Sequence, residues 1–90
     1  MAALFRLRIV TPESTLVDED VISVTAPGTE GYLGVLAQHA PLITALAPGK
    51  ITVRNASGAL EEYTVTGGFL QVADNRATVL ADSARRGGGR

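Results

Sequence analysis

The stretch YTVTGGFLQVADNRATVLA, residues 63–81, contains the pattern that decides the fold. Tyr63 and Val65 alternate with threonines, and apolar residues again occupy every second position at 77–81. A period of two places alternate side chains on opposite faces of an extended chain. The turn-forming groups at 66–68 and 73–75, rich in Gly, Asp and Asn, interrupt the alternation. The stretch therefore predicts short strands that bury one face.

The same alternation recurs along the rest of the chain. Further alternating runs lie at 5–10, 22–25 and 51–54, and further turn signals lie at 12–14, 18–20, 26–28, 47–49 and 55–58. Short alternating runs separated by such turns predict a β-sandwich or a β-barrel. No segment has a sustained helical period. His39 to Leu46 is the only candidate for a helical turn, and Pro41 keeps it short.

Length and composition limit the classes of function. Ninety residues suit one domain, which we place at 1–85 with a flexible Gly/Arg tail at 86–90. The net charge of −1 argues against a protein that mainly grips nucleic acid. The N-terminus lacks the pattern of a signal peptide, and no apolar run approaches the ~20 residues that span a bilayer. Without cysteine, no disulfide supplements the core.

Two loop motifs invite a functional interpretation. The glycines at 28, 31 and 34 are spaced like those of a phosphate-binding loop, but no Lys-Ser/Thr pair or helix pattern follows them. A tight turn with close backbone approach is favoured. The acidic run Asp18-Glu19-Asp20 lacks the spacing of a calcium loop, so we expect a solvated turn.

His39 is the only histidine and the natural candidate for catalysis. A metal site would need further His or Cys ligands, which the sequence does not offer. None of the serines sits in a G-x-S-x-G turn, the context of a nucleophile elbow. We therefore expect no catalytic residue, no metal and no cofactor, and a His39 that bonds the backbone or touches a partner. The residues alone thus indicate a β-sandwich that acts as a binding module.

The middle of the chain resembles a known family. Residues 30–49, EGYLGVLAQHAPLITALAPG, are similar to the signature of the epsilon subunit of F-type ATP synthases, approximately E-G-x-L-G-x-x-x-x-H-A-P-L-x-T-x-L-x-P-G. The segments 63–72 and 75–84 and the opening at 7–13 resemble the same family. The resemblance covers nearly all of residues 4–85. One departure is Tyr32, where some family members carry an acidic residue.

The resemblance implies a fold and a role. The family's N-terminal domain is a ten-stranded antiparallel sandwich of two five-stranded sheets. It belongs to the central stalk, where it links the gamma subunit to the polar loops of the membrane c-ring and couples ion flow to ATP synthesis, with the catalytic sites on other subunits. Its expected location is the cytoplasmic face of the bacterial inner membrane, held there through the complex. The family usually continues into a C-terminal helical hairpin, which the 90 residues do not include, so we expect either a naturally short form of the subunit or a shortened version of a longer one.

The resemblance also assigns residues. A loop facing the c-ring is expected from Gly31, Tyr32, Gln38, His39, Ala40 and Pro41, and a surface facing gamma from Thr11, Leu42, Ile43 and Thr44. Gly49, Gly67 and Gly68 are expected to shape the backbone. Two alternatives stay open. One is a generic protein- or carbohydrate-binding sandwich, and the scarcity of aromatic residues counts against its carbohydrate-binding version. The other is a small hydrolase built around His39.

Overall fold

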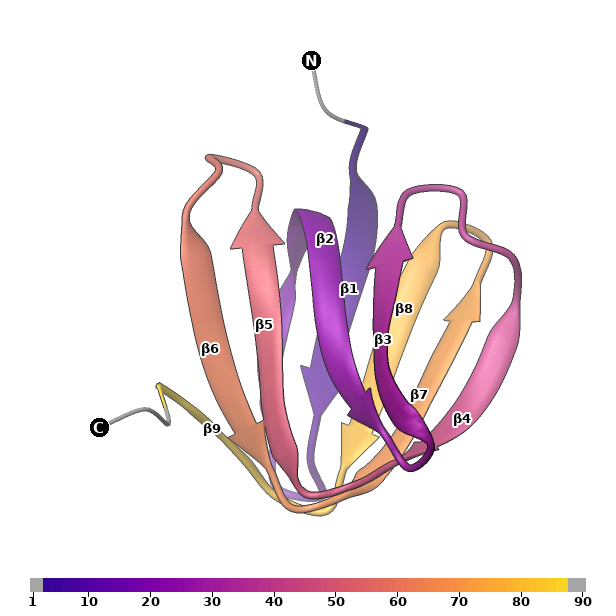
Figure 1. The fold of residues 1–90 in the computed structure, drawn as a ribbon. Helices are drawn as coiled ribbons and strands as arrows, with labels where there is room; N and C mark the ends of the chain where they lie inside the picture. The colour runs from indigo at the N-terminus through magenta and orange to yellow at the C-terminus, as the bar shows by residue number, and fades with distance from the viewer. Residues whose placement is uncertain (1–2, 88–90) are drawn as a thin grey trace.

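The computed structural model describes residues 3–87, and these residues form nine β-strands and no helix (Figure 1). The expected all-β class is confirmed. The strands are β1 (Phe5–Val10), β2 (Thr15–Gly28), β3 (Gly31–Leu36), β4 (Leu42–Leu46), β5 (Gly49–Asn55), β6 (Leu60–Val65), β7 (Gly68–Ala73), β8 (Arg76–Ala81) and β9 (Ala84–Arg86). None of these residues belongs to a helix long and apolar enough to cross a membrane.

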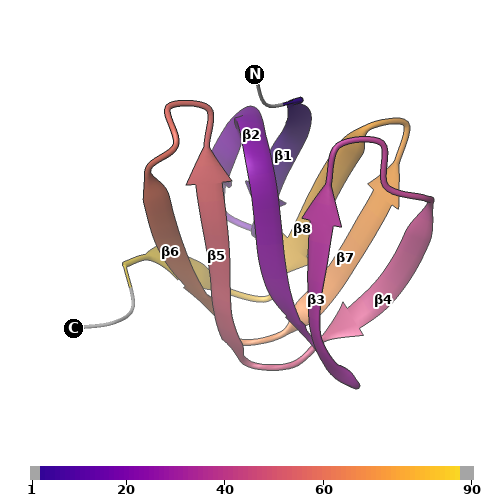
Figure 2. The same ribbon diagram turned by 45° about the horizontal axis from the view of Figure 1, so that its top comes forward.

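The strands form two facing layers (Figures 1 and 2). In one layer, β4, β7, β8 and β1 are neighbours, and β1 pairs with the first half of β2. In the other layer, the second half of β2 lies between β3 and β5, followed by β6 and β9. All pairings are antiparallel except that of β1 with β8.

The expected count of ten strands in two separate sheets is not confirmed, because the long β2 belongs to both layers. β2 is 14 residues long, and its pairing shifts from β1 to β5 at Val21. A register shift lies between Val21 and Ser23, and such a bulge bends a strand and increases its twist. Hydrogen bonding therefore continues from one layer to the other, and the nine strands form one connected sheet.

The core lies between the layers and consists of the inward residues of the alternating runs. In β1, Phe5, Leu7 and Ile9 are buried, whereas Arg6 and Arg8 face solvent. The described residues bury no charged or polar side chain in this core. Burying each large aliphatic side chain is worth about 1.5–3 kcal/mol, which makes the alternation the main determinant of the layered fold.

Tight turns join the strands at positions where the sequence has the residues that tolerate positive φ. Asp74 and Asn75 have φ of 54° and 60° in the two-residue turn between β7 and β8. Asp and Asn adopt this left-handed conformation more readily than other non-glycine residues. Gly67 and Gly68 have φ of 132° and 137°, and a Cβ at Gly68 would overlap the carbonyl oxygen of Leu80. Both glycines are required by backbone geometry, as expected.

One local expectation was wrong, and the one candidate for a helical turn is not helical. The acidic run Asp18-Glu19-Asp20 is no turn but lies within β2, where Asp18 and Asp20 bond the guanidinium of Arg6 across the strand pair. The segment from His39 to Leu46 holds no helical turn, because Leu42–Leu46 pairs with β7 as β4.

The C-terminal boundary also differs from the expected one. β9 extends to Arg86, which pairs with Tyr63, so the sandwich includes the first residue of the expected tail. Residues 88–90 of that tail lie outside the described residues.

Candidate functional site

The outer face of the layer containing β4, β7, β8 and β1 carries a row of apolar side chains, of which the middle two are exposed and the outer two half-buried. Strand register aligns Val10 with Leu80, Leu80 with Phe69, and Phe69 with Ala45. The row thus crosses four strands. Phe69 and Leu80 are 54% and 50% exposed. We call these four residues the apolar row.

The next rows on the same face become progressively polar. The register places Arg8, Thr78, Gln71 and Ile43 in the second row, and Arg6, Arg76 and Ala73 in the third. Ile43 is 71% exposed and extends the apolar area along β4. A contiguous apolar surface with a polar border is typical of a protein interface, whereas isolated exposed apolar residues need no explanation.

The apolar row borders a shallow hollow of ≈ 430 Å³. Its lining includes Val10, Thr11, Pro12, Phe69, Leu80 and Asp82. Thr11 is fixed there because its hydroxyl accepts a bond from the backbone N–H of Ser14 at 3.3 Å, closing the turn after β1. The hollow can receive an apolar side chain of a partner, with the hydroxyl of Thr11 and the carboxylate of Asp82 at its border.

The four residues expected to face gamma divide between the two sides of the layer. Ile43 lies on the outer face, and Thr11 lines the hollow beside Phe69. Thr44 pairs with the fully buried Leu70, and Leu42 packs against the core. Because alternate residues of β4 face opposite sides, the consecutive residues 42–44 cannot all reach one partner.

The expected c-ring-facing loop is corrected by the position of β3. Gly31 and Tyr32 begin β3, next to the β2–β3 turn, whereas Gln38, His39, Ala40 and Pro41 follow its far end (Figure 1). At about 3.3 Å per residue, the six-residue β3 is ~16 Å long, and the two groups lie at its two ends. The residues are close in sequence but lie at opposite ends of the sandwich, so they do not form one loop.

Asn75 holds the connection between β3 and β4 in place. Its Oδ1 accepts the backbone N–H of Gln38 at 2.8 Å, and its Nδ2 donates to the carbonyl oxygen of Leu4 at 3.0 Å. Gln38 has a φ of 66°, an uncommon conformation for this residue type that the bond to Asn75 stabilises. Sequence reasoning identified Asn75 only as a turn residue, because its partners lie 37 and 71 positions away.

His39 forms a local contact with the backbone. Its Nδ1 lies 2.7 Å from the carbonyl oxygen of Ala40, and its backbone N–H donates to Leu36 at 3.2 Å. Within residues 3–87, no group of three or more His, Cys, Asp or Glu could hold a metal ion. The surroundings of His39 thus favour a role in loop structure or partner contact.

A second polar cluster fastens β9 to β6. The buried Tyr63 donates its hydroxyl to Glu61 Oε1 at 3.0 Å, and the guanidinium of Arg86 lies 5.1 Å from the centroid of the Tyr63 ring. Burial, together with the bond to Glu61, raises the pKa of Tyr63 to about 12. The phenol therefore stays protonated at neutral pH, and the cluster serves attachment of the last strand.

Comparisons with known proteins agree on one family. A family profile described as "ATP synthase, Delta/Epsilon chain, beta-sandwich domain" matches residues 4–87. An ATP synthase epsilon chain of Mesorhizobium japonicum is 48% identical over 93% of this chain, and one of Pelotomaculum thermopropionicum is 52% identical over 90%. The chain spans 62% and 60% of the length of these two relatives.

Two solved structures of ATP synthases contain a chain with the same fold as this one. A chain of the Euglena gracilis mitochondrial ATP synthase, solved as an OSCP/F1/c-ring assembly, superimposes with a TM-score of 0.88 at 28% identity. The match covers 96% of this chain and 55% of that one. A chain from the central stalk and c-ring structure of Tetrahymena thermophila mitochondrial ATP synthase shares the fold, with a TM-score of 0.77 at 20% identity over 93% of this chain and 67% of that one.

Proposed function

This chain belongs to the ATP synthase delta/epsilon family through its β-sandwich domain, and we propose that it is a non-catalytic central-stalk subunit of an F-type ATP synthase. In this role it joins the gamma subunit to the membrane c-ring and turns with both, so that ion flow is coupled to ATP synthesis at sites on other subunits. It lies at the cytoplasmic face of a bacterial inner membrane, attached through the complex. The apolar row carries the proposal, since it gives the sandwich a docking face.

Gamma is the proposed occupant of this face. Phe69, Leu80 and Ile43 expose large apolar side chains on neighbouring strands, and Thr11 lines the adjoining hollow. Burying such a group on association supplies the apolar centre of an interface, with the second and third rows as its polar border. The family resemblance names gamma as the partner of this domain.

The c-ring is proposed to contact the end of the sandwich at the β2–β3 turn. Tyr32 is 64% exposed beside this turn, which lies at the periphery of the molecule in both views (Figures 1 and 2). Gln38 to Pro41 lie at the other end, and one flat ring surface cannot contact both ends. We therefore retain Gly31 and Tyr32 as the residues that contact the c-ring. His39 and its neighbours, at the opposite end of the sandwich, are assigned to the part of the stalk that faces away from the ring.

The strand architecture is suited to transmitting torque. The contact surfaces lie on strands and on short turns tied to them, and β2 connects the two layers through its backbone. Rigid elements with few mobile loops transmit force with little local unfolding.

Co-purification tests the gamma contact. The chain carrying Phe69→Glu should fail to recover gamma from detergent-solubilised membranes, because a carboxylate replaces the centre of the apolar row. Leu60→Glu is the matched control, since Leu60 is similarly exposed at 60% but lies on β6 of the other layer. Equal recovery of gamma by both variants would argue against this docking face.

Cross-linking tests the ring contact. A cysteine at Tyr32 should cross-link to a cysteine in the polar loop of the c-ring, and a cysteine at His39 should not. The two positions lie at opposite ends of the sandwich, so the reverse result would assign the ring to the other end.

A further inference from the structure

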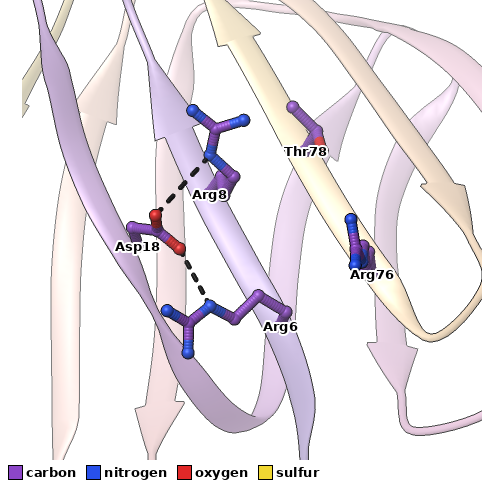
Figure 3. Close-up of a pocket in the computed structure, with 5 residues that line it drawn as sticks. All are labelled: Arg6, Arg8, Asp18, Arg76 and Thr78. Carbon is purple, nitrogen blue, oxygen red and sulfur yellow. Dashed lines mark hydrogen bonds and ion pairs between the residues drawn. The ribbon is translucent and has the colours of Figure 1, made fainter.

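Three arginines gather on the docking face beyond the apolar row. Arg6 and Arg8 of β1 and Arg76 of β8 surround a hollow of ≈ 410 Å³, together with Asp18 and Thr78 (Figure 3). We propose that this hollow receives an acidic segment of gamma, the partner proposed to cover the apolar row. The inference rests on the proposed function and adds the chemistry of the partner surface.

The internal carboxylates leave the cluster incompletely neutralised. Arg6 bonds Asp18 at 2.9 Å and Asp20 at 3.2 Å, whereas Arg8 reaches the other oxygen of Asp18 only at 3.9 Å. Among residues 3–87, no carboxylate lies within 4.0 Å of Arg76. Within the hollow itself, three guanidinium groups face the single carboxylate of Asp18.

A third carboxylate nearby, that of Asp74, does not hold Arg76. Asp74 lines a neighbouring hollow that Arg76 also borders, but it forms no ion pair in the described part of the chain. Both of these side chains are exposed, so water screens their interaction. Arg76 therefore remains available to an anion that enters the hollow.

The strand register places two arginines side by side but leaves the carboxylates on only one of them. Arg6 is the direct neighbour of Arg76 across the β1–β8 pair, and their side chains share the outer face. Asp18 and Asp20 bond Arg6, whereas Arg76 has no ion pair among residues 3–87. The charge of Arg76 therefore adds no ion pair to this part of the fold, which leaves it available for binding.

Geometry and continuity favour a protein carboxylate as the occupant. A guanidinium matches a carboxylate with two parallel hydrogen bonds, and the hydroxyl of Thr78 adds a donor to the lining. The second row, from Arg8 to Ile43, joins the hollow to the apolar row. A partner that covers Phe69 and Ile43 therefore extends over the arginines, where its Asp or Glu side chains would complete the ion pairs.

Arg76→Gln tests the inference by separating binding from stability. In the isolated chain, Tm should stay within about 3 °C of the wild type, because Arg76 is exposed and forms no ion pair among residues 3–87. In binding to purified gamma, the same variant should lose about tenfold in affinity, and the affinity should depend less on salt concentration. Arg85→Gln on β9 of the other layer is the matched control and should change neither value.

The outcomes separate this inference from the proposed function. If Phe69→Glu abolishes gamma binding and Arg76→Gln leaves it unchanged, the docking face stands and the acidic segment is refuted. If neither variant weakens binding, both proposals fail. A fall in Tm beyond this range for Arg76→Gln would also overturn the inference, because it would assign the arginine to stability. So would stabilisation of the wild type by inorganic phosphate that Arg76→Gln removes while gamma binding is unchanged, since the occupant would then be a free anion.

Discussion

Replacement of Gly68 by alanine should be among the most damaging single-methyl changes in this protein. Gly68 has a φ of 137°, and its Cβ would overlap the carbonyl oxygen of Leu80 and lie 2.9 Å from the Cα of Ala81. Backbone strain at such a φ costs about 1–3 kcal/mol, and a methyl group forced into packed backbone costs a further ~1–3 kcal/mol. The expected loss of about 2–6 kcal/mol is a large share of the ~5–15 kcal/mol that stabilises a typical domain.

Gly34→Ala is the matched control for this prediction. Gly34 is an exposed strand residue outside the group with positive φ, and no atom lies within 4 Å of a Cβ added there. Its replacement should change the free energy of unfolding by less than about 0.5 kcal/mol, or raise it slightly by reducing the entropy of the unfolded chain.

Urea denaturation followed by far-UV circular dichroism measures both changes, and the absence of tryptophan makes fluorescence a weaker probe. Midpoints of the two variants that agree to within the error of the fit would refute the backbone argument. A large loss from Gly34→Ala with none from Gly68→Ala would refute the strand assignments at both positions.

Two further predictions concern side chains that hold the ends of the sandwich. Asn75→Gly keeps a residue that tolerates the φ of 60° but loses the hydrogen bonds to Gln38 and Leu4. It should destabilise the chain by about 1–3 kcal/mol and speed exchange of the Gln38 amide proton, which NMR measures. An unchanged exchange rate at Gln38 would show that Asn75 does not hold the loop. Tyr63 has its pKa raised from 10.0 to about 12, so its contribution is fully present below pH 10 and is lost as the pH rises towards 12, because the unfolded phenol ionises first. Between these pH values the wild type should lose roughly 2 kcal/mol more stability than Tyr63→Phe, and parallel pH profiles of the two proteins would contradict the assignment.

The fold class follows from the alternation, but the connection between the layers does not. Every second residue of β1 and of β8 is apolar, and those residues form the core. The acidic run at 18–20 resembles a turn because the sequence gives no sign that Arg6, 12 and 14 positions away, neutralises it across a strand pair. The bend of β2 between the layers likewise depends on a bulge at Val21–Ser23 that no turn residue announces.

The candidate site was only partly visible in the sequence. Ile43 and Thr11 were expected to face gamma, but Phe69 and Leu80, which form the centre of the proposed docking face, were missed. A signal existed, since both are large apolar residues at positions that the alternation assigns to the solvent side. The six residues expected to face the c-ring do not form one loop, for a different reason. Its residues are neighbours in sequence, and only the extended β3 reveals that Tyr32 and His39 lie at opposite ends.

Hydroxyl-radical footprinting of the chain with and without gamma tests the docking face most directly. The proposed function predicts that oxidation of Ile43, Phe69 and Leu80 falls strongly on binding, whereas oxidation of the similarly exposed Leu60 on the other layer does not change. Protection of Leu60 with undiminished oxidation of Phe69 and Leu80 would contradict the proposal that gamma covers the outer face of β4, β7, β8 and β1.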